Sequence, residues 1–142
     1  METERYRILP HTADGKFQAY GRTLGEAFGN AALALASLMW DWRRVEPKVR
    51  RRVRVDGMDR EQLLVKFLGE IVFLFEARRF LLGRVDEVEI RPGSGRLSLE
   101  AVLAGETLSA RHELHGGVKA VTYHDLRIEE RGGFTVQVVV DM

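Results

Sequence analysis

Apolar residues recur at helical spacing in two stretches of the chain. Thr23 and Glu26 have the spacing of a capping box, and Asp59 and Gln62 repeat it further on. Behind the first pair the apolar positions are Leu24, Ala27, Phe28, Ala31, Ala32, Leu35, Leu38 and Met39; behind the second they are Leu63, Leu64, Phe67, Leu68, Ile71, Val72 and Phe75. The pattern predicts two helices, the second ending at Arg78 and Arg79, where cations complement the helix dipole.

Alternation of polar and apolar residues predicts strands in the rest of the chain. We expect them at residues 5–9, 16–21, 48–55, 85–90, 97–103, 106–112, 118–129 and 134–141, with glycine-rich turns at 92–95 and 131–133. No helix separates the late strands, which argues against a doubly wound parallel sheet. The order favours an α+β fold, with mostly antiparallel sheet or sheets and two main helices packed on one face.

Composition is that of an ordinary soluble globular domain, and we expect one domain over residues 1–142. The net charge of +1 gives no overall field that would demand nucleic acid. The absence of cysteine excludes disulfides and thiolate metal sites. The charged N-terminal residues do not form a signal peptide, and no apolar run is long enough for a membrane span, so we expect a cytoplasmic protein with no membrane partner.

The familiar catalytic motifs are missing from the sequence. His112 and His115 are three residues apart, whereas the zinc-protease motif needs histidines four apart on one helical face. The turn at residues 93–95 lacks the Gly-Lys-Ser/Thr that completes a phosphate loop. We therefore expect no enzymatic activity of its own.

One dense run of cations lies between residues 43 and 54. Its members are Arg43, Arg44, Lys48, Arg50, Arg51, Arg52 and Arg54. The run is either a surface for RNA phosphates or an acidic partner, or an edge strand protected by charge against aggregation. No aromatic residue for base stacking lies within the run, so the edge strand is the favoured interpretation.

Two aspartates stand at predicted strand ends. Asp14 lies in the turn before the second strand, and Asp141 ends the last strand beside the carboxyl group of Met142. If these strands are neighbours, the carboxylates converge and need a hard divalent cation such as Ca²⁺, Mg²⁺ or Mn²⁺. The simpler alternative, in which Asp14 caps its turn and Asp141 is solvated, is favoured on spacing alone because nothing local joins the two.

A lysine stands within an apolar segment late in the chain. In a strand from residue 118, Lys119 shares a face with Val121 and Tyr123, and Val118, Ala120 and Thr122 form the other face. A lysine between apolar neighbours either extends its ammonium group to water or faces a specific anion.

Short motifs in a fixed order resemble the archease family over nearly the whole chain. They are His11-Thr12-Ala13-Asp14, Thr23-Leu24-Gly25-Glu26-Ala27-Phe28, Met39, Asp41, Leu63-Leu64-Val65, Phe67-Leu68, Glu70, Gly105-Glu106, the heptapeptide from Val118 to His124, and Val140-Asp141. The segment Gly15-Lys16-Phe17 departs from the small apolar run that is commoner in the family.

The resemblance implies a function that the residues alone do not. It implies an accessory protein of the GTP-dependent RNA-splicing ligase, which joins 3′-phosphate or 2′,3′-cyclic phosphate ends to 5′-hydroxyl ends. Such a protein promotes guanylylation of the ligase and multiple turnover, chiefly in tRNA splicing, and meets RNA only indirectly.

The same resemblance assigns roles to particular residues. It implies a divalent metal ion, Ca²⁺ first, held by Asp14, Asp141 and Met142, and a ligase-activating role for Lys119. His11, His124 and Asp41 are expected to orient the groups around this site. The alternative is a chaperone-like or RNA-binding module that uses residues 43–54. An independent metallohydrolase is disfavoured because no general base is clearly placed.

Overall fold

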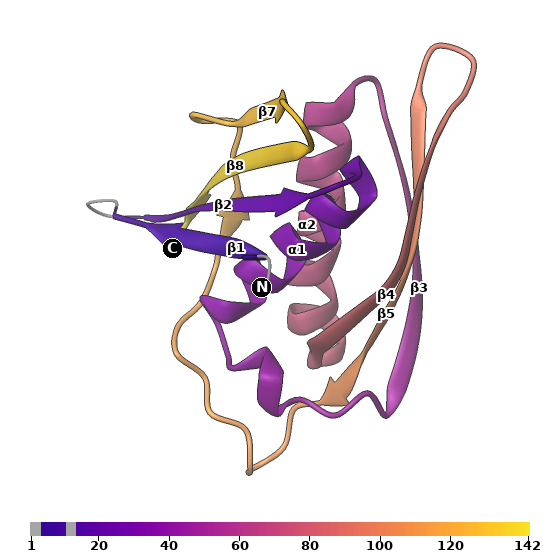
Figure 1. Ribbon diagram of the computed structural model, residues 1–142. Helices are drawn as coiled ribbons and strands as arrows, with labels where there is room; N and C mark the ends of the chain where they lie inside the picture. The colour runs from indigo at the N-terminus through magenta and orange to yellow at the C-terminus, as the bar shows by residue number, and fades with distance from the viewer. Residues whose placement is uncertain (1–3, 11–13) are drawn as a thin grey trace.

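The computed structural model describes residues 4–10 and 14–142 (Figure 1). Its helices are α1 (Leu24–Ser37), the short 3₁₀ helix η1 (Trp42–Arg44) and α2 (Arg60–Arg78). Its strands are β1 (Tyr6–Leu9), β2 (Gly15–Gly21), β3 (Val49–Gly57), β4 (Phe80–Pro92), β5 (Leu97–Thr107), β6 (Ala120–Val121), β7 (Arg127–Glu130) and β8 (Phe134–Asp141).

The strands form two antiparallel sheets, and both helices lie between them (Figure 1). One sheet has the order β1-β2-β8-β6, with β7 pairing the same edge of β8 as β6. The other has the order β3-β5-β4. Each sheet therefore has the helices on one face and its other face turned outward, which confirms the expected α+β class. Neither α1 nor α2 is long and apolar enough to cross a membrane.

The caps anticipated in the sequence begin both helices. The Thr23 hydroxyl accepts a hydrogen bond from the Glu26 main-chain N–H at 3.1 Å. At α2 the Asp59 carboxylate accepts from the Gln62 N–H at 2.8 Å, and the Gln62 side chain accepts from the Met58 N–H at 2.7 Å. These bonds satisfy main-chain donors that the first helical turn leaves unpaired, so the local sequence alone determines where the helices start.

The helix α1 is buried almost all round because it contacts both sheets. Its buried residues are Ala27, Phe28, Gly29, Ala31, Ala32, Leu33, Ala34, Leu35 and Ala36. Small side chains let both sheets approach the helix closely, and a helix that is apolar on every side is stable only inside a protein. The ring of Phe28 stacks on that of Phe67 from α2, with centroids 6.4 Å apart.

Three strand predictions need correction. The strand expected from residue 85 already begins at Phe80, because Phe80, Leu81 and Leu82 are buried against the core directly after α2. The separate strand expected at 106–112 is absent: β5 continues to Thr107, and the described residues after it form a loop. The strand expected over 118–129 is also wrong, since only Ala120–Val121 and Arg127–Glu130 pair with β8.

The break between β6 and β7 changes the setting of Lys119. A turn interrupts the strand, and its Asp125 has a left-handed φ of 52°. Tyr123 is 56% exposed, and Lys119 lies on the surface. The lysine side chain therefore extends to water, which is one of the two alternatives that the sequence left open.

Candidate functional site

The sheet topology brings the sequence-predicted carboxylates to one end of the five-stranded sheet. β2 and β8 pair in an unbroken register that reaches Gly15 opposite Val140. One step further along this register stand Asp14 and Asp141. On the other side of β8, Asp141 pairs with Ala120 of β6. The strands that carry the two aspartates are thus neighbours, although they are far apart in the sequence.

Lys119 is attached to the same end of the sheet through its main chain. Its N–H donates a hydrogen bond to the Asp141 carbonyl at 2.7 Å. The preceding Val118 is buried with 4% of its surface exposed and anchors the segment in the core. The lysine side chain therefore starts beside Asp141 and extends from there at the surface.

The last residue packs across the base of this sheet end. A methyl group built on Gly15 would lie 2.8 Å from the Leu38 side chain, 2.9 Å from that of Val140 and 3.1 Å from the Met142 sulfur. Glycine at this position leaves room for the Met142 side chain to fold back over β2. The packing holds Met142 next to Gly15, the residue that follows Asp14.

The donor chemistry of this end suits a hard cation. The described residues contain no group of three or more His, Asp or Glu side chains that could hold a metal ion. A site here would instead use two carboxylates and a main-chain oxygen of Met142, an oxygen-only set of the kind that Ca²⁺ and Mg²⁺ prefer. Asp141 is exposed and Asp14 is half-buried, so the position is open to a partner.

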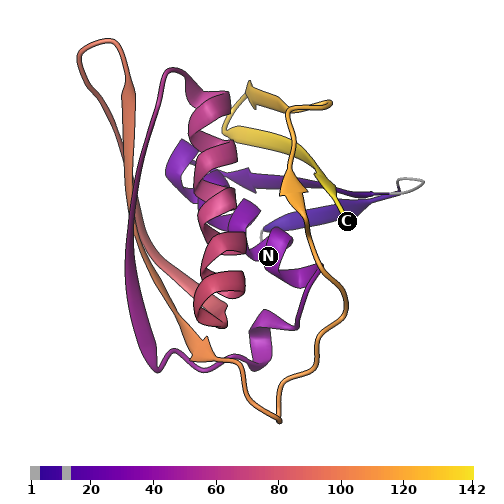
Figure 2. The ribbon, with the colours of Figure 1, turned by 180° about the vertical axis from the view of Figure 1, so that it is seen from behind.

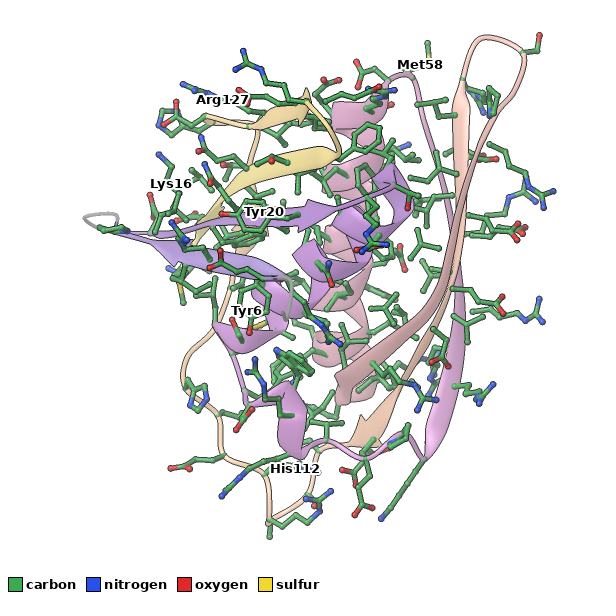
Figure 3. The ribbon with its side chains drawn as sticks, viewed as in Figure 1. Tyr6, Lys16, Tyr20, Met58, His112 and Arg127 are labelled. Carbon is green, nitrogen blue, oxygen red and sulfur yellow. The ribbon has the colours of Figure 1, made fainter. Side chains whose placement is uncertain are left out.

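The residues expected to orient groups around this site are His11, His124 and Asp41. His11 lies outside the described residues. His124 is exposed, and its Nε2 lies 3.6 Å from the Asp125 carboxylate. Asp125 also faces Lys16 at 3.9 Å, and Lys16 projects from the outer face of β2 with Tyr20 (Figure 3). Asp41 caps η1 by accepting a hydrogen bond from the Arg43 N–H at 3.1 Å, which is a structural role.

A buried ionic cluster around Glu106 was missed by the sequence analysis. Glu106 is 5% exposed, and its carboxylate accepts hydrogen bonds from the Glu46 main-chain N–H at 2.8 Å, from His112 at 3.1 Å and from Arg111. Lys48 lies 3.6 Å away. The cluster ties the end of β5 to the segment after η1 and to the loop after β5. A carboxylate directly after the run Leu103-Ala104-Gly105, which is buried in the structure, is the signal that could have revealed it.

The ring of His112 is fully engaged in this cluster. Its Nδ1 accepts a hydrogen bond from the Ser109 main-chain N–H at 2.9 Å, so the ring proton is on Nε2 and points to Glu106. Neither nitrogen is available to a metal ion. In Figure 3, His112 lies at the lower end of the molecule, far from Lys16 on the five-stranded sheet.

The cluster predicts acid-dependent stability. The Glu46 N–H, followed by Arg111 and His112, lowers the pKa of Glu106 from 4.5 to about 2, against the opposing effect of burial. A carboxyl group whose pKa is lower in the folded state stabilises the protein fully above its unfolded pKa, and this stabilisation is lost as pH falls from 4.5 towards 2. Glu106→Gln should lower the free energy of unfolding at pH 7 by about 2 kcal/mol, because Arg111 and Lys48 lose the negative charge that they face.

Urea unfolding at pH 7 and at pH 2.5 measures this effect. The difference between wild type and Glu106→Gln should shrink at the lower pH, where Glu106 is losing its charge. Glu100→Gln is the matched control, since Glu100 is an exposed carboxylate of the same strand. An equal loss of stability at both pH values would assign the effect to packing rather than to charge.

Comparison with known proteins agrees with the fold. The model of the family described as "Archease protein family (MTH1598/TM1083)" matches residues 6–142. Protein archease of Methanosarcina mazei is 40% identical over 141 residues, covering 98% of this chain and 97% of the relative. Protein archease of Pyrobaculum calidifontis is 44% identical over 140 residues, covering 96% and 95%.

A solved structure has the same architecture. The solution structure of Methanobacterium thermoautotrophicum protein 1598 superimposes with a TM-score of 0.83 at 34% identity, covering 96% of this chain and 98% of that one. The chain is thus a small α+β protein with two aspartates, Asp14 and Asp141, at one end of its five-stranded sheet. The chain belongs to the archease family. Membership supports, at the level of the family, an accessory role in RNA processing.

Proposed function

We propose that this protein activates a GTP-dependent RNA-splicing ligase in tRNA splicing. It promotes guanylylation of the ligase and so allows one ligase molecule to join many RNA ends. The observation that carries the proposal is the convergence of Asp14, Asp141 and the main chain of Lys119 at one end of the five-stranded sheet. Family membership over residues 6–142 supports the choice of partner.

A divalent ion, Ca²⁺ in the first instance, is part of this proposal. Asp14, Asp141 and Met142 would hold it through oxygen atoms, the ligands that a hard divalent cation prefers. When bound, the ion supplies positive charge that can attract a phosphate or an acidic group of the ligase. The packing of Met142 over Gly15 keeps the chain end in place for this role.

Lys119 supplies the second positive charge. An ammonium group is a compact, strongly hydrated charge on a flexible stem, which suits a site that must reach a phosphate or carboxylate on another molecule. The buried Val118 and the hydrogen bond to Asp141 fix the main chain from which this stem extends. The exposure of Lys119 is what an activating contact with the ligase requires.

The alternative function, a chaperone-like or RNA-binding module based on residues 43–54, has less support. Arg54 lies 3.9 Å from Glu100 on the outward face of the three-stranded sheet. Glu100 of β5 also pairs with Glu89 of β4. Glu87 lies two residues before Glu89 on the same face of β4. Carboxylates this close to the arginines repel the phosphates of an RNA laid across the face.

A turnover assay tests the proposal. The cognate ligase is held at limiting concentration with excess RNA ends and GTP, and ligated product is counted per ligase molecule. With this protein we expect many turnovers, and without it about one or fewer. Formation of ligase–guanylate from radiolabelled GTP, measured in the same samples, should rise in parallel. Product formation that is the same with and without the protein would reject the proposed function.

A further inference from the structure

The basic strand β3 forms an open edge of the three-stranded sheet. It pairs with β5 on one side only within the described chain, and Figure 2 shows it running alongside α2 at the border of its sheet. Its side chains alternate as the sequence predicted: Arg50, Arg52 and Arg54 are exposed, and Arg51 is half-buried on the helix side. An open edge presents unpaired main-chain groups that can accept another strand.

The two edges of this sheet are built differently. The opposite edge strand, β4, has register shifts between Leu82 and Arg84 and between Val85 and Glu87. There the α1 helix comes so close that a methyl group on Gly25 would lie 2.6 Å from the Val88 carbonyl oxygen. β3 pairs with β5 from Val49 to Gly57 without any shift. Bulges and a covering helix protect β4 from pairing, whereas β3 has no bulge and α2 reaches its open edge at Asp56.

The main-chain groups on the open edge belong to the exposed arginines. Lys66 of α2 donates a hydrogen bond to the Asp56 carbonyl at 2.9 Å, which identifies Asp56 as a residue whose main chain points away from β5. In a regular antiparallel ladder, alternate residues point to the same side. Arg50, Arg52 and Arg54 therefore direct their N–H and C=O groups to the open edge, and a strand added there would pair with each of them.

The positive charge of this edge is largely unneutralised. Of Arg50, Arg52 and Arg54, only Arg54 has an ion pair with a described residue, Glu100 at 3.9 Å. On the inner face the Arg51 guanidinium lies over the Phe80 ring at 5.9 Å, and its buried Nε lacks a hydrogen-bond partner in the described part of the chain. Opposite charges directly across a strand pair are favourable, and like charges are unfavourable.

We propose that β3 is a docking edge for an extended acidic segment of a partner protein, with Asp or Glu at alternate positions opposite Arg50, Arg52 and Arg54. Main-chain pairing supplies the attachment, and the carboxylates select the partner and the register. A second copy of this chain added antiparallel would place arginine opposite arginine and is disfavoured. RNA is disfavoured because no aromatic residue for base stacking lies within residues 43–54. This inference is independent of the proposed ligase activation.

The test uses a fluorescein-labelled nonapeptide, Thr-Glu-Val-Glu-Val-Glu-Val-Glu-Thr, and the full-length protein. Fluorescence anisotropy should show saturable binding, and hydrogen exchange should slow at the amides of Arg50, Arg52 and Arg54. Arg52→Glu should weaken binding by about tenfold or more, through loss of one charge pair and gain of a repulsive one. Arg91→Glu, the same charge change on β4, is the matched control and should have little effect.

Two further arms separate strand pairing from simple charge attraction. Arg52→Pro removes both the charge and a main-chain donor at the open edge, where proline is tolerated, whereas Arg52→Ala removes the charge alone. Arg52→Pro should therefore bind more weakly than Arg52→Ala. The same peptide N-methylated at its glutamates keeps its charge but cannot donate those hydrogen bonds, and it should not bind. Absence of binding by the unmodified peptide, or equal binding of the methylated one, would overturn the proposal. So would tighter binding of oligouridine that is lost in Arg52→Glu and weakened equally in Arg52→Pro and Arg52→Ala, which would identify a nucleic-acid surface.

Discussion

Replacing Lys119 by alanine is expected to abolish activation of the ligase while leaving the protein folded. The side chain is exposed, so its removal costs little packing, and the main-chain hydrogen bond to Asp141 remains possible in the variant. Turnovers per ligase molecule should fall to about the level without this protein. The melting temperature should stay within about 2 °C of wild type, as for most exposed substitutions.

Two further variants, Lys119→Arg and Arg127→Ala, test whether activation needs this particular positive charge. Arginine keeps the charge but spreads it over a wide planar group, so Lys119→Arg should also fail if the site needs a compact charge. Arg127 is an exposed cation on β7, which pairs with the same strand as β6, and its removal should leave activation intact. A folded Lys119→Ala protein that still supports full turnover would reduce the lysine to a solvated surface residue.

Addition of Ca²⁺ to the metal-free protein should raise its melting temperature, and Asp14→Asn should remove most of that rise. A ligand that binds only the folded state stabilises it by about 2.7 kcal/mol at a hundred times its dissociation constant. For a protein of this size this corresponds to several degrees, roughly 5–10 °C. Differential scanning fluorimetry after chelation, with Ca²⁺ and then Mg²⁺ or Mn²⁺ added back, measures the shift and ranks the ions.

Asp125→Asn is the matched control for the metal experiment. Asp125 is an exposed carboxylate that faces Lys16 and His124, and asparagine tolerates its left-handed φ of 52°. Its metal-dependent shift should equal that of wild type. If none of these ions changes the wild-type melting temperature, the proposal that Asp14 and Asp141 share a metal ion is rejected. Lys119 would then remain as the residue to test in ligase activation.

The predicted helices agree with the structure because their signals are local. Thr23 and Asp59 bond to main-chain N–H groups three residues ahead, and the apolar positions behind them repeat at the period of the helix. The last strand and the two glycine-rich turns are likewise encoded within a few residues. The α+β class followed from the order of these elements.

Two of the strand errors arise because a pairing partner is distant in sequence. β5 is a central strand with a neighbour on each side, so pairing with β3 and β4 extends it beyond the expected end at residue 103 to Thr107. The segment from 118 reads as one strand, yet β8 accepts it only at Ala120–Val121 and again at Arg127–Glu130. Alternation within a segment does not reveal where its partner strand lies.

The sequence by itself determined the helices, the alternating basic strand and the presence of carboxylates at two strand ends, because each depends on neighbours within a few residues. Only the tertiary structure decided that β2 and β8 pair, which brings the positions of Asp14 and Asp141 into one row. It alone also decided that Glu106 is buried among its donors and that Lys119 is exposed. These outcomes depend on the register between strands far apart in the chain, and cooperative packing of the whole core sets that register.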